Sequence, residues 1–283
     1  MTMDTGSGGS AASEIKHVPS SLMRQTLLDR ELVLPATDRE PIRLLPWLGV
    51  VKIGGRSIMD RGFEAVSSVV SELKEALGEH RLLIATGSGI RSRHLFSVGL
   101  DLGLPTGVLA ALASSDAEQN GHIVAALLAE HGVAYLPHAT VGHQLPVFLS
   151  AARAVVTNAI PPYELYEFPP AVGKLPPHGT DAGALLIAEA WGARRVVLVE
   201  DVDGVYTADP NGPDGGEAEL IAKVGASELK QMDLPSLPFD HIVLDLMAHG
   251  RLVEEIQVVN GLKPGSILRA LEGEHVGTII HAD

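Results

Sequence analysis

The 283-residue sequence contains no cysteine, and this absence removes several kinds of chemistry at once. Without thiols the chain has no disulfide, no thiolate nucleophile and no zinc site built on sulfur. The twelve histidines are therefore the soft metal ligands that the chain can offer. The sequence also lacks the six-residue glycine fingerprint of dinucleotide-binding folds and the Walker A phosphate loop. A nucleotide site in this chain would have to be built in another way.

Basic residues are scarce relative to acidic ones. The chain has 21 Lys and Arg against 35 Asp and Glu, for a net charge of −14 at pH 7. General binding to nucleic acid depends on clustered Lys and Arg, which release counterions from the phosphates. The composition therefore argues against a nucleic-acid binder but leaves room for a local cationic pocket. No apolar run approaches the ~20 residues that a membrane-spanning helix needs, so no membrane partner is expected.

The N-terminal stretch reads as an arm ahead of the main domain. Its start, "MTMDTGSGGSAAS", lacks the basic and apolar regions of a secretory signal, which favours a cytoplasmic location. The segment 20–32 has helical spacing and a serine cap, and a helix this short needs a surface to pack on. We expect residues 1–41 to form a flexible arm with one short helix that takes part in subunit assembly. Residues 42–283 are expected to form a single domain.

From residue 42 onwards, apolar strand-like runs alternate with helical patterns. The predicted strands are 45–53, 81–86, 133–137, 154–160, 194–200, 254–261 and 276–282. The predicted helices are 63–78, 87–103, 116–132, 143–152, 180–192, about 226–232, about 242–251 and one beginning at Pro264. Strands separated by helices imply a mainly parallel sheet covered on both faces. The fold class is therefore α/β.

A single lysine lies in the first predicted strand, within "VVKIGGRS". A lysine at the end of an otherwise buried strand is costly unless its ammonium group meets an anion. The glycines that follow, Gly54 and Gly55, let the backbone turn sharply or let a ligand come close. Lys52 with these glycines therefore predicts a phosphate-sized site at the end of the strand.

Two further glycine-bearing strand ends are expected at the same edge of the sheet, because ligands of open α/β sheets bind at the carboxyl ends of the strands. They are "TGSGIRSR" (86–93) and "VDGVYTADP" (202–210). In the first of them, Arg91 and Arg93 could reach a phosphate or another oxyanion. Each motif alone is weak, since a glycine pair is common in tight turns.

Together with "TDAGALLIAEAWGA" (180–193), these motifs resemble the amino-acid kinase family, which includes uridylate, aspartate and acetylglutamate kinases. The resemblance runs from about residue 46 to the end, and "VDGVYTADP" is its most specific element. It implies a three-layer αβα sandwich that binds ATP. By the same resemblance Lys52 and Asp181 act at the transferred phosphoryl group. The phosphates are held by Lys52, Gly54, Gly55, Gly87, Ser88 and Gly89, and the adenosine is bordered by Asp203, Gly204, Tyr206, Thr207, Asp209 and Pro210.

One departure from the kinases concerns the strand before "VDGV". Uridylate kinases carry a second lysine there, whereas this chain has Leu198 and Glu200 around that place. Phosphoryl transfer depends mainly on positioning and charge stabilisation, so the loss of a cation should cost orders of magnitude in rate. Glu200 could instead hold Mg²⁺, which prefers carboxylate oxygen and phosphate. The sequence therefore predicts an ATP site poorly suited to ordinary kinase chemistry.

A narrower resemblance spans about residue 15 to the end. Segments such as "PIRLLPWLGVVKIGGRSIMDRG", "RHLFSVGLDLGLP", "PPYELYEFPP" and "DGVYTADPNGPD" are similar to the molybdenum storage protein family, most of all to its alpha-type subunit. That family forms a cage-like hexamer of two related subunit types and uses ATP to deposit molybdate or tungstate as polyoxometalate clusters. The resemblance implies that Glu200 and the backbone carbonyl of Pro238 contact Mg²⁺. It leaves open a hetero-hexamer with a beta-type subunit or a homo-oligomer.

The cluster ligands of the alpha-type family are largely replaced in this chain. The corresponding positions carry Pro137, Phe148, Glu164, Leu165 and Tyr166, and only His138 is retained, with His143 added nearby. Imidazole nitrogen and carboxylate oxygen can bind molybdenum or tungsten directly, so His138, His143 and Glu164 are the candidate metal ligands. Either the clusters differ in size and position from those of the family, or hydrogen bonds alone hold them.

Three functions fit these observations. The first is an ATP-binding oxometalate storage subunit, with possible hydrolysis of ATP during deposition. The second is a small-molecule kinase of the same fold acting on a nucleotide such as UMP. The third is a catalytically silent subunit that completes an oligomer and holds ATP as a bound cofactor. Glu200 in place of the second lysine disfavours the kinase.

Overall fold

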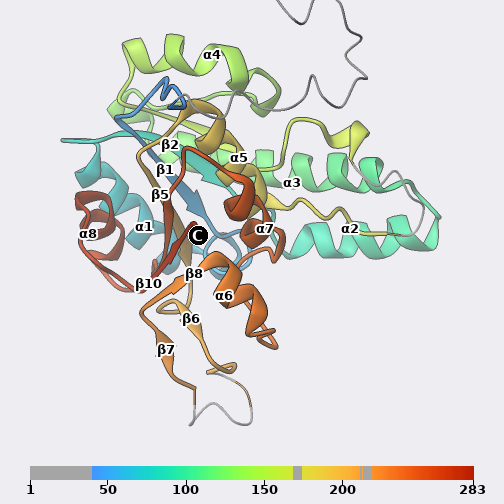
Figure 1. Cartoon of the computed structure of the whole chain (residues 1–283). Helices are drawn as coiled ribbons and strands as arrows, with labels where there is room; N and C mark the ends of the chain where they lie inside the picture. Colours follow the sequence, from blue (N-terminus) through green and yellow to red (C-terminus); the bar gives the residue numbers. More distant parts are fainter. Residues whose placement is uncertain (1–39, 168–173, 211, 213–217) are drawn as a thin grey trace, which may run out of the picture. The chain divides into compact units, whose positions relative to one another are not determined.

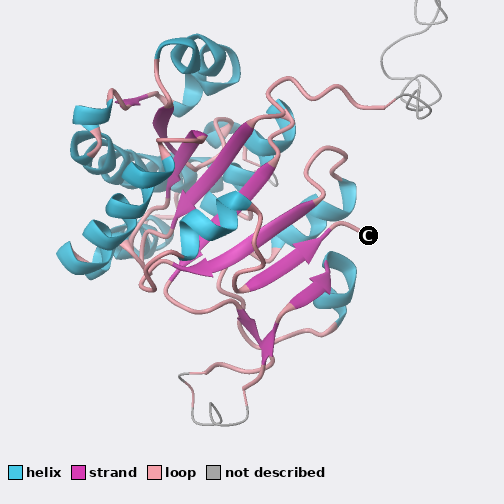
Figure 2. Cartoon of the chain, turned by 90° about the vertical axis from the view of Figure 1, so that its left-hand side faces the viewer, coloured by secondary structure: helices cyan, strands magenta, loops and turns pink. Residues whose placement is uncertain are grey.

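The computed structural model describes residues 40–167, 174–210, 212 and 218–283. Their centre is an eight-stranded sheet with the strand order β3-β4-β2-β1-β5-β9-β10-β8 (Figures 1 and 2). The six strands from β3 to β9 in this order are parallel, and β10 pairs antiparallel with β9. The strands are β1 (Leu48–Ile53), β2 (Arg81–Thr86), β3 (Ala134–Tyr135), β4 (Ala154–Asn158), β5 (Arg195–Glu200), β8 (Lys223–Gly225), β9 (Glu255–Asn260) and β10 (Thr278–His281).

Helices cover the sheet on both faces. They are α1 (Phe63–Ala76), α2 (Ile90–Asp101), α3 (Thr106–Leu127), α4 (His138–Ala151), α5 (Thr180–Trp191), α6 (Ala226–Gln231), α7 (Ile242–His249) and α8 (Ser266–Glu272). One buried cluster joins the sheet to α1, α8 and the end of α3, and a second joins it to α4, α5, α6 and α7. This arrangement confirms the predicted three-layer αβα sandwich with a mainly parallel sheet.

The central strands are continuous aliphatic runs because both of their faces are buried. In β1, Leu48 and Val50 belong to the cluster on the α5 side, while Val51 and Ile53 belong to the cluster on the α1 side. Side chains of a strand alternate between the two faces, so Lys52 shares the α5 side with Val50. The sequence pattern thereby decides which helices the lysine can meet.

Most predicted elements are present, with differences at four places, one of which is the unpredicted three-residue strand β8. The helix predicted at 116–132 begins ten residues earlier, at Thr106 directly after Pro105, because the alanine-rich stretch that follows is strongly helix-forming. The helix predicted at 143–152 begins at His138. A two-stranded hairpin of β6 (Val205–Tyr206) and β7 (Leu220–Ile221) was not predicted, because strands of two residues carry no periodic signal.

The structure does not test two predictions, which are the N-terminal helix and the cytoplasmic location. The short helix at 20–32 lies outside the described residues, so the arm and its role in assembly stay predictions. Within the part of the chain that is described, every helix is too short or too polar to cross a lipid bilayer. The cytoplasmic location stays a prediction as well.

Candidate functional site

Lys52 forms the centre of a buried ionic cluster at the carboxyl edge of the sheet. Its side chain is 5% exposed, and its Nζ lies 2.5 Å from Asp181 Oδ1 and 2.7 Å from Glu200 Oε1. Asp181 stands in the first turn of α5, and Glu200 is the last residue of β5, the strand beside β1. Burial alone would lower the pKa of Lys52, but the charges of Asp181 and Glu200 outweigh it and hold the pKa above its ordinary value. The lysine is therefore a fixed positive charge.

Glu200 is held from a second side by a serine. Ser57 Oγ donates a hydrogen bond of 2.5 Å to Glu200 Oε2, while Lys52 occupies the other carboxylate oxygen. Burial raises the pKa of Glu200, and the charge of Lys52 opposes this rise. Ser57 was not predicted from the sequence as a residue of this site. Its only signal was its position directly after the "KIGGR" stretch.

Asp240 adds a third carboxylate to the cluster. Its backbone N–H donates to Asp181 Oδ2 (3.0 Å), and the N–H of Asp181 donates back to Asp240 Oδ2 (3.1 Å). Burial, followed by the charge of Asp181, raises the pKa of Asp240 to about 7. Pro238, a predicted Mg²⁺ contact through its carbonyl, lies two residues before Asp240 and is half-buried. The loop that carries Pro238 is thus tied to Asp181.

The charges of this cluster fit a divalent cation. Asp181, Glu200 and Asp240 carry three negative charges when ionised, and Lys52 supplies one positive charge to balance them. A buried surplus of negative charge is unfavourable unless a cation or protons neutralise it. Mg²⁺ takes carboxylate oxygens as ligands and keeps the remaining positions for water and phosphate. Glu200 is consequently suited to hold Mg²⁺ at this edge.

The glycines after β1 and β2 allow two loops to touch through their backbones. A β-carbon on Gly55 would lie 1.5 Å from the carbonyl oxygen of Ser88, and one on Gly54 would lie 1.8 Å from Ser57 Oγ. The N–H of Gly87 donates to the carbonyl of Ile53 (2.9 Å). Among the described residues, no acceptor receives the N–H of Gly55 or Ser88. These two groups can therefore donate to a ligand.

The loop after β2 is capped by carboxylates of the chain itself. Asp116 Oδ2 accepts the N–H groups of Gly89 (3.1 Å) and Ser92 (2.9 Å), and Asp60 Oδ2 accepts the N–H of Ile90 (2.5 Å). The N–H of Gly89 is therefore already engaged at the start of α2. Asp60 and Asp116 were not predicted, because their contacts join residues about 25–30 positions apart.

The arginines of this region lie in different surroundings. Arg91 turns towards α3, where it contacts Asp116 (2.7 Å), Asn120 (2.8 Å) and Gln119 (3.0 Å). Arg93 is exposed on α2. The predicted reach of Arg91 to a phosphate would require it to leave these partners.

The predicted adenosine border is a polar cluster after β5. Asp203 accepts hydrogen bonds from Asn260 Nδ2 (2.9 Å) and Lys263 Nζ (2.7 Å), and the bond from Lys263 lowers the pKa of Asp203. Gly204 has a φ of 149°, and a β-carbon there would lie 2.2 Å from Thr278 Oγ1. The other predicted residues of this border are Tyr206, whose hydroxyl lies 3.4 Å from Asp203 Oδ2, Thr207 in the hairpin, and Asp209 and Pro210 just before the undescribed residue 211.

The predicted cluster ligands are only partly brought together. His138, at the start of α4, pairs through Nε2 with Glu164, while exposed His143 lies farther along the same helix. Asn158 Oδ1 accepts the N–H of Ile160, so its amide Nδ2 faces His138 Nδ1 at 2.8 Å. Because an amide nitrogen donates, His138 Nδ1 accepts and the ring proton lies on Nε2. Nε2 lies beside Glu164 Oε1, which receives no hydrogen bond among the described residues. Among the described residues, no group of three or more His, Asp or Glu side chains is arranged to hold a metal ion.

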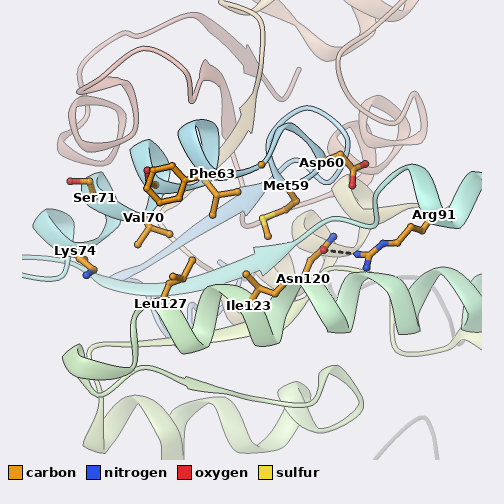
Figure 3. Close-up of a pocket in the computed structure, with 13 residues that line it drawn as sticks. Met59, Asp60, Phe63, Val70, Ser71, Lys74, Arg91, Asn120, Ile123 and Leu127 are labelled. Carbon is orange, nitrogen blue, oxygen red and sulfur yellow. Dashed lines mark hydrogen bonds between the residues drawn. The ribbon is translucent and has the colours of Figure 1, made fainter.

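A cavity of about 700 Å³ lies between α1 and α3 (Figure 3). Apolar side chains such as Phe63, Val70, Ile123 and Leu127 line most of it. At one end are Asp60, Arg91 and Asn120, and Asn120 Nδ2 donates a hydrogen bond to the carbonyl of Gly87 in the loop after β2. Lys52, Asp181 and Glu200 do not line this cavity, so it is separate from the ionic cluster.

Comparison with known proteins relates the chain to kinases and to a storage protein. The sequence model described as "Amino acid kinase family" matches residues 48–259. The molybdenum storage protein subunit beta of Azotobacter vinelandii (strain DJ / ATCC BAA-1303) is 43% identical over 271 residues, which cover 96% of this chain and 99% of that protein. A uridylate kinase of Hyperthermus butylicus (strain DSM 5456 / JCM 9403 / PLM1-5) is 28% identical over 239 residues, which cover 82% and 96% respectively.

A solved structure supports the same fold. The uridylate kinase from Archaeoglobus fulgidus matches with a TM-score of 0.65 at 20% sequence identity, covering 82% of this chain and 99% of that chain. This likeness, together with the family match, confirms the predicted amino-acid-kinase architecture.

Proposed function

This chain belongs to the amino acid kinase family, and within that family we propose that it is a molybdenum or tungsten storage subunit that binds Mg-ATP. The observation that carries the proposal is the 43% identity to a molybdenum storage protein subunit over 96% of the chain. The uridylate kinases are more distant, at 28% identity or below. The alpha-type assignment remains a proposal, since the storage relative found is a beta-type subunit.

In this proposal the ATP phosphates lie over the touching glycine loops. The free N–H groups of Gly55 and Ser88 support the placement, because backbone N–H groups at strand ends are suited to phosphate oxygens. Lys52 supplies a fixed positive charge beside them, and Asp181 orients it. The adenosine would lie towards Asp203 and the β6–β7 hairpin. ATP, when bound, supplies the free energy for deposition.

Magnesium would be held by Glu200, with the carbonyl of Pro238 as the second protein contact. The surplus of buried carboxylates favours a divalent cation at this place. Glu200 is positioned for it by Ser57 and Lys52. A carboxylate here takes the place where uridylate kinases carry their second lysine, so the arrangement supports nucleotide binding more than rapid phosphoryl transfer.

The oxometalate cargo would be held near His138, Glu164 and His143. In the tautomer that the contact with Asn158 favours, His138 carries its N–H on Nε2, and its Nδ1 is engaged by Asn158. The Nε2–H group is therefore available to donate a hydrogen bond to a cluster oxygen. Direct metal ligation through Nδ1 would require Asn158 to move away. The contact between His138 and Asn158 therefore favours clusters held mainly by hydrogen bonds. The oligomer that encloses them would be a hetero-hexamer with a beta-type subunit or a homo-oligomer.

Metal retention tests the storage proposal. Protein incubated with molybdate, Mg²⁺ and ATP and then desalted should keep many molybdenum atoms per chain, measured by elemental analysis. The double change His138→Ala, His143→Ala should reduce the retained metal several-fold. His94→Ala, which removes an exposed histidine of α2, should leave it unchanged. If no metal is retained with or without ATP, even after mixing with a beta-type partner, the storage function is wrong for this chain, and a silent structural subunit is favoured.

The alternative is a nucleotide kinase, and a coupled assay with UMP, ATP and Mg²⁺ separates the two. We expect turnover far below the common enzyme range of about 1–1000 per second, because Glu200 replaces a cation at the transferred phosphate. The change Glu200→Lys should increase any residual activity if the charge at this place is limiting. Turnover within the common range in the unchanged protein would favour the kinase over storage.

A further inference from the structure

The charge of Lys52 is already balanced before any phosphate arrives. Its ammonium group lies 2.5 Å from Asp181 Oδ1 and 2.7 Å from Glu200 Oε1. The backbone N–H of Asp240 donates a hydrogen bond to Asp181. A polyphosphate tail that approaches this cluster meets more negative than positive charge. Binding of the tail therefore needs a positive group in addition to Lys52 and a metal ion.

Several basic side chains near this edge are engaged with acidic partners. Arg61 pairs with Asp201, Lys263 with Asp203 and Arg91 with Asp116. Arg56 differs from them. It is exposed, and among the described residues it forms neither an ion pair nor a hydrogen bond through its side chain. Its guanidinium is therefore available to an outside anion.

The backbone around Arg56 is anchored on both sides. On one side, Gly55 lies against the carbonyl of Ser88, and its own N–H is free. On the other, Ser57 is bound to Glu200 by a hydrogen bond of 2.5 Å. The carbonyl of Gly54 accepts the N–H groups of both Ile58 and Met59. Arg56 thus projects from a fixed loop that directly follows the strand of Lys52.

We propose that Arg56 is a phosphate-binding residue of the nucleotide site and supplies the cation that Glu200 replaced. The proposal rests on the proposed function, because it names the residue that holds the phosphate tail of ATP. A guanidinium suits this task better than an ammonium would. It stays charged, and its planar fork can donate two hydrogen bonds to one phosphate. Its exposed position lets it close over the tail after the nucleotide has entered.

Calorimetric titration of the full chain with Mg-ATP and with adenosine tests the role. Arg56→Gln should weaken Mg-ATP binding at least about tenfold and leave adenosine binding unchanged, because only the tail meets the guanidinium. Arg56→Lys should recover part of the affinity. Arg153→Gln is the matched control, since it removes another exposed arginine, directly before β4 at the opposite edge of the sheet, and should have no more than a twofold effect.

The outcomes separate this role from the proposed function. Wild-type protein that binds Mg-ATP while Arg56→Gln binds it equally well overturns the role of Arg56 alone. An equal loss in Arg153→Gln also overturns it, because the effect is then general electrostatic attraction. Wild-type protein that does not bind Mg-ATP overturns the nucleotide site and the role of Arg56 together.

Discussion

Replacing Lys52 with methionine is expected to abolish measurable Mg-ATP binding and to lower the free energy of unfolding by about 3–5 kcal/mol. Methionine keeps the length of the side chain but leaves Asp181 and Glu200 buried without their shared counter-charge. Removing one partner of a buried ion pair costs far more than the pair contributes net, because the remaining charge stays desolvated. Denaturant unfolding followed by circular dichroism measures the stability, and calorimetry measures the nucleotide affinity.

The matched control is Lys74→Met on α1. Lys74 also pairs with a glutamate, Glu130, but both partners are partly exposed to solvent. Solvent screens such a pair, so its loss should change the free energy of unfolding far less than the loss of Lys52 does. A Lys52→Met protein that unfolds at the same denaturant concentration as Lys74→Met, and still binds Mg-ATP, would contradict both the buried cluster and the nucleotide assignment.

Replacing Asp240 with asparagine should flatten the dependence of stability on pH. The pKa of Asp240 is about 7 in the folded protein and near 3.8 in the unfolded chain. At a pH between these two pKa values, Asp240 is protonated in the folded protein and ionised in the unfolded chain. The free energy of unfolding therefore falls as the pH rises from about 4 to about 7, by at most about 4 kcal/mol. Asparagine carries no charge at any of these pH values, so this loss of stability should disappear.

The comparison is made by denaturant unfolding at pH 5 and at pH 8. Asparagine still offers an oxygen to the N–H groups of Asp181 and Ala182, so Asp240→Asn should be more stable than wild type at pH 8. Asp245→Asn on α7 is the control, because Asp245 is a partly exposed partner of Lys230. If Asp240→Asn keeps the wild-type difference between pH 5 and pH 8, Asp240 is ionised throughout and the argument from burial fails.

The two predictions depend on the same feature, which is the surplus of buried carboxylate around one lysine. Mg²⁺ bound at Glu200 would offset this surplus, so the stability of wild-type protein at pH 8 should depend more on Mg²⁺ than that of Asp240→Asn. The feature also explains why an efficient kinase is not expected. A phosphoryl group in transfer needs positive charge, whereas three of the four ionisable groups here are acidic.

The sequence by itself determined the fold class and the edge of the sheet that carries the site. Aliphatic runs such as the one at Val50–Ile53 are buried on both faces as expected, and the alternation with helices gave the parallel sheet. A lysine inside such a run, followed by Gly54 and Gly55, predicted a buried cation, and Lys52 is buried. These features are local, because periodicity, propensity and the lack of a β-carbon act over neighbouring residues.

Only the tertiary structure decided which groups surround Lys52. Glu200 lies 148 positions away in the chain, and its contact exists because β1 and β5 are neighbours in the sheet. The exchange of hydrogen bonds between Asp181 and Asp240, and the tautomer that Asn158 imposes on His138, likewise join separate elements. Side-chain pairing and desolvation depend on the packing of distant segments, and no local pattern encodes them.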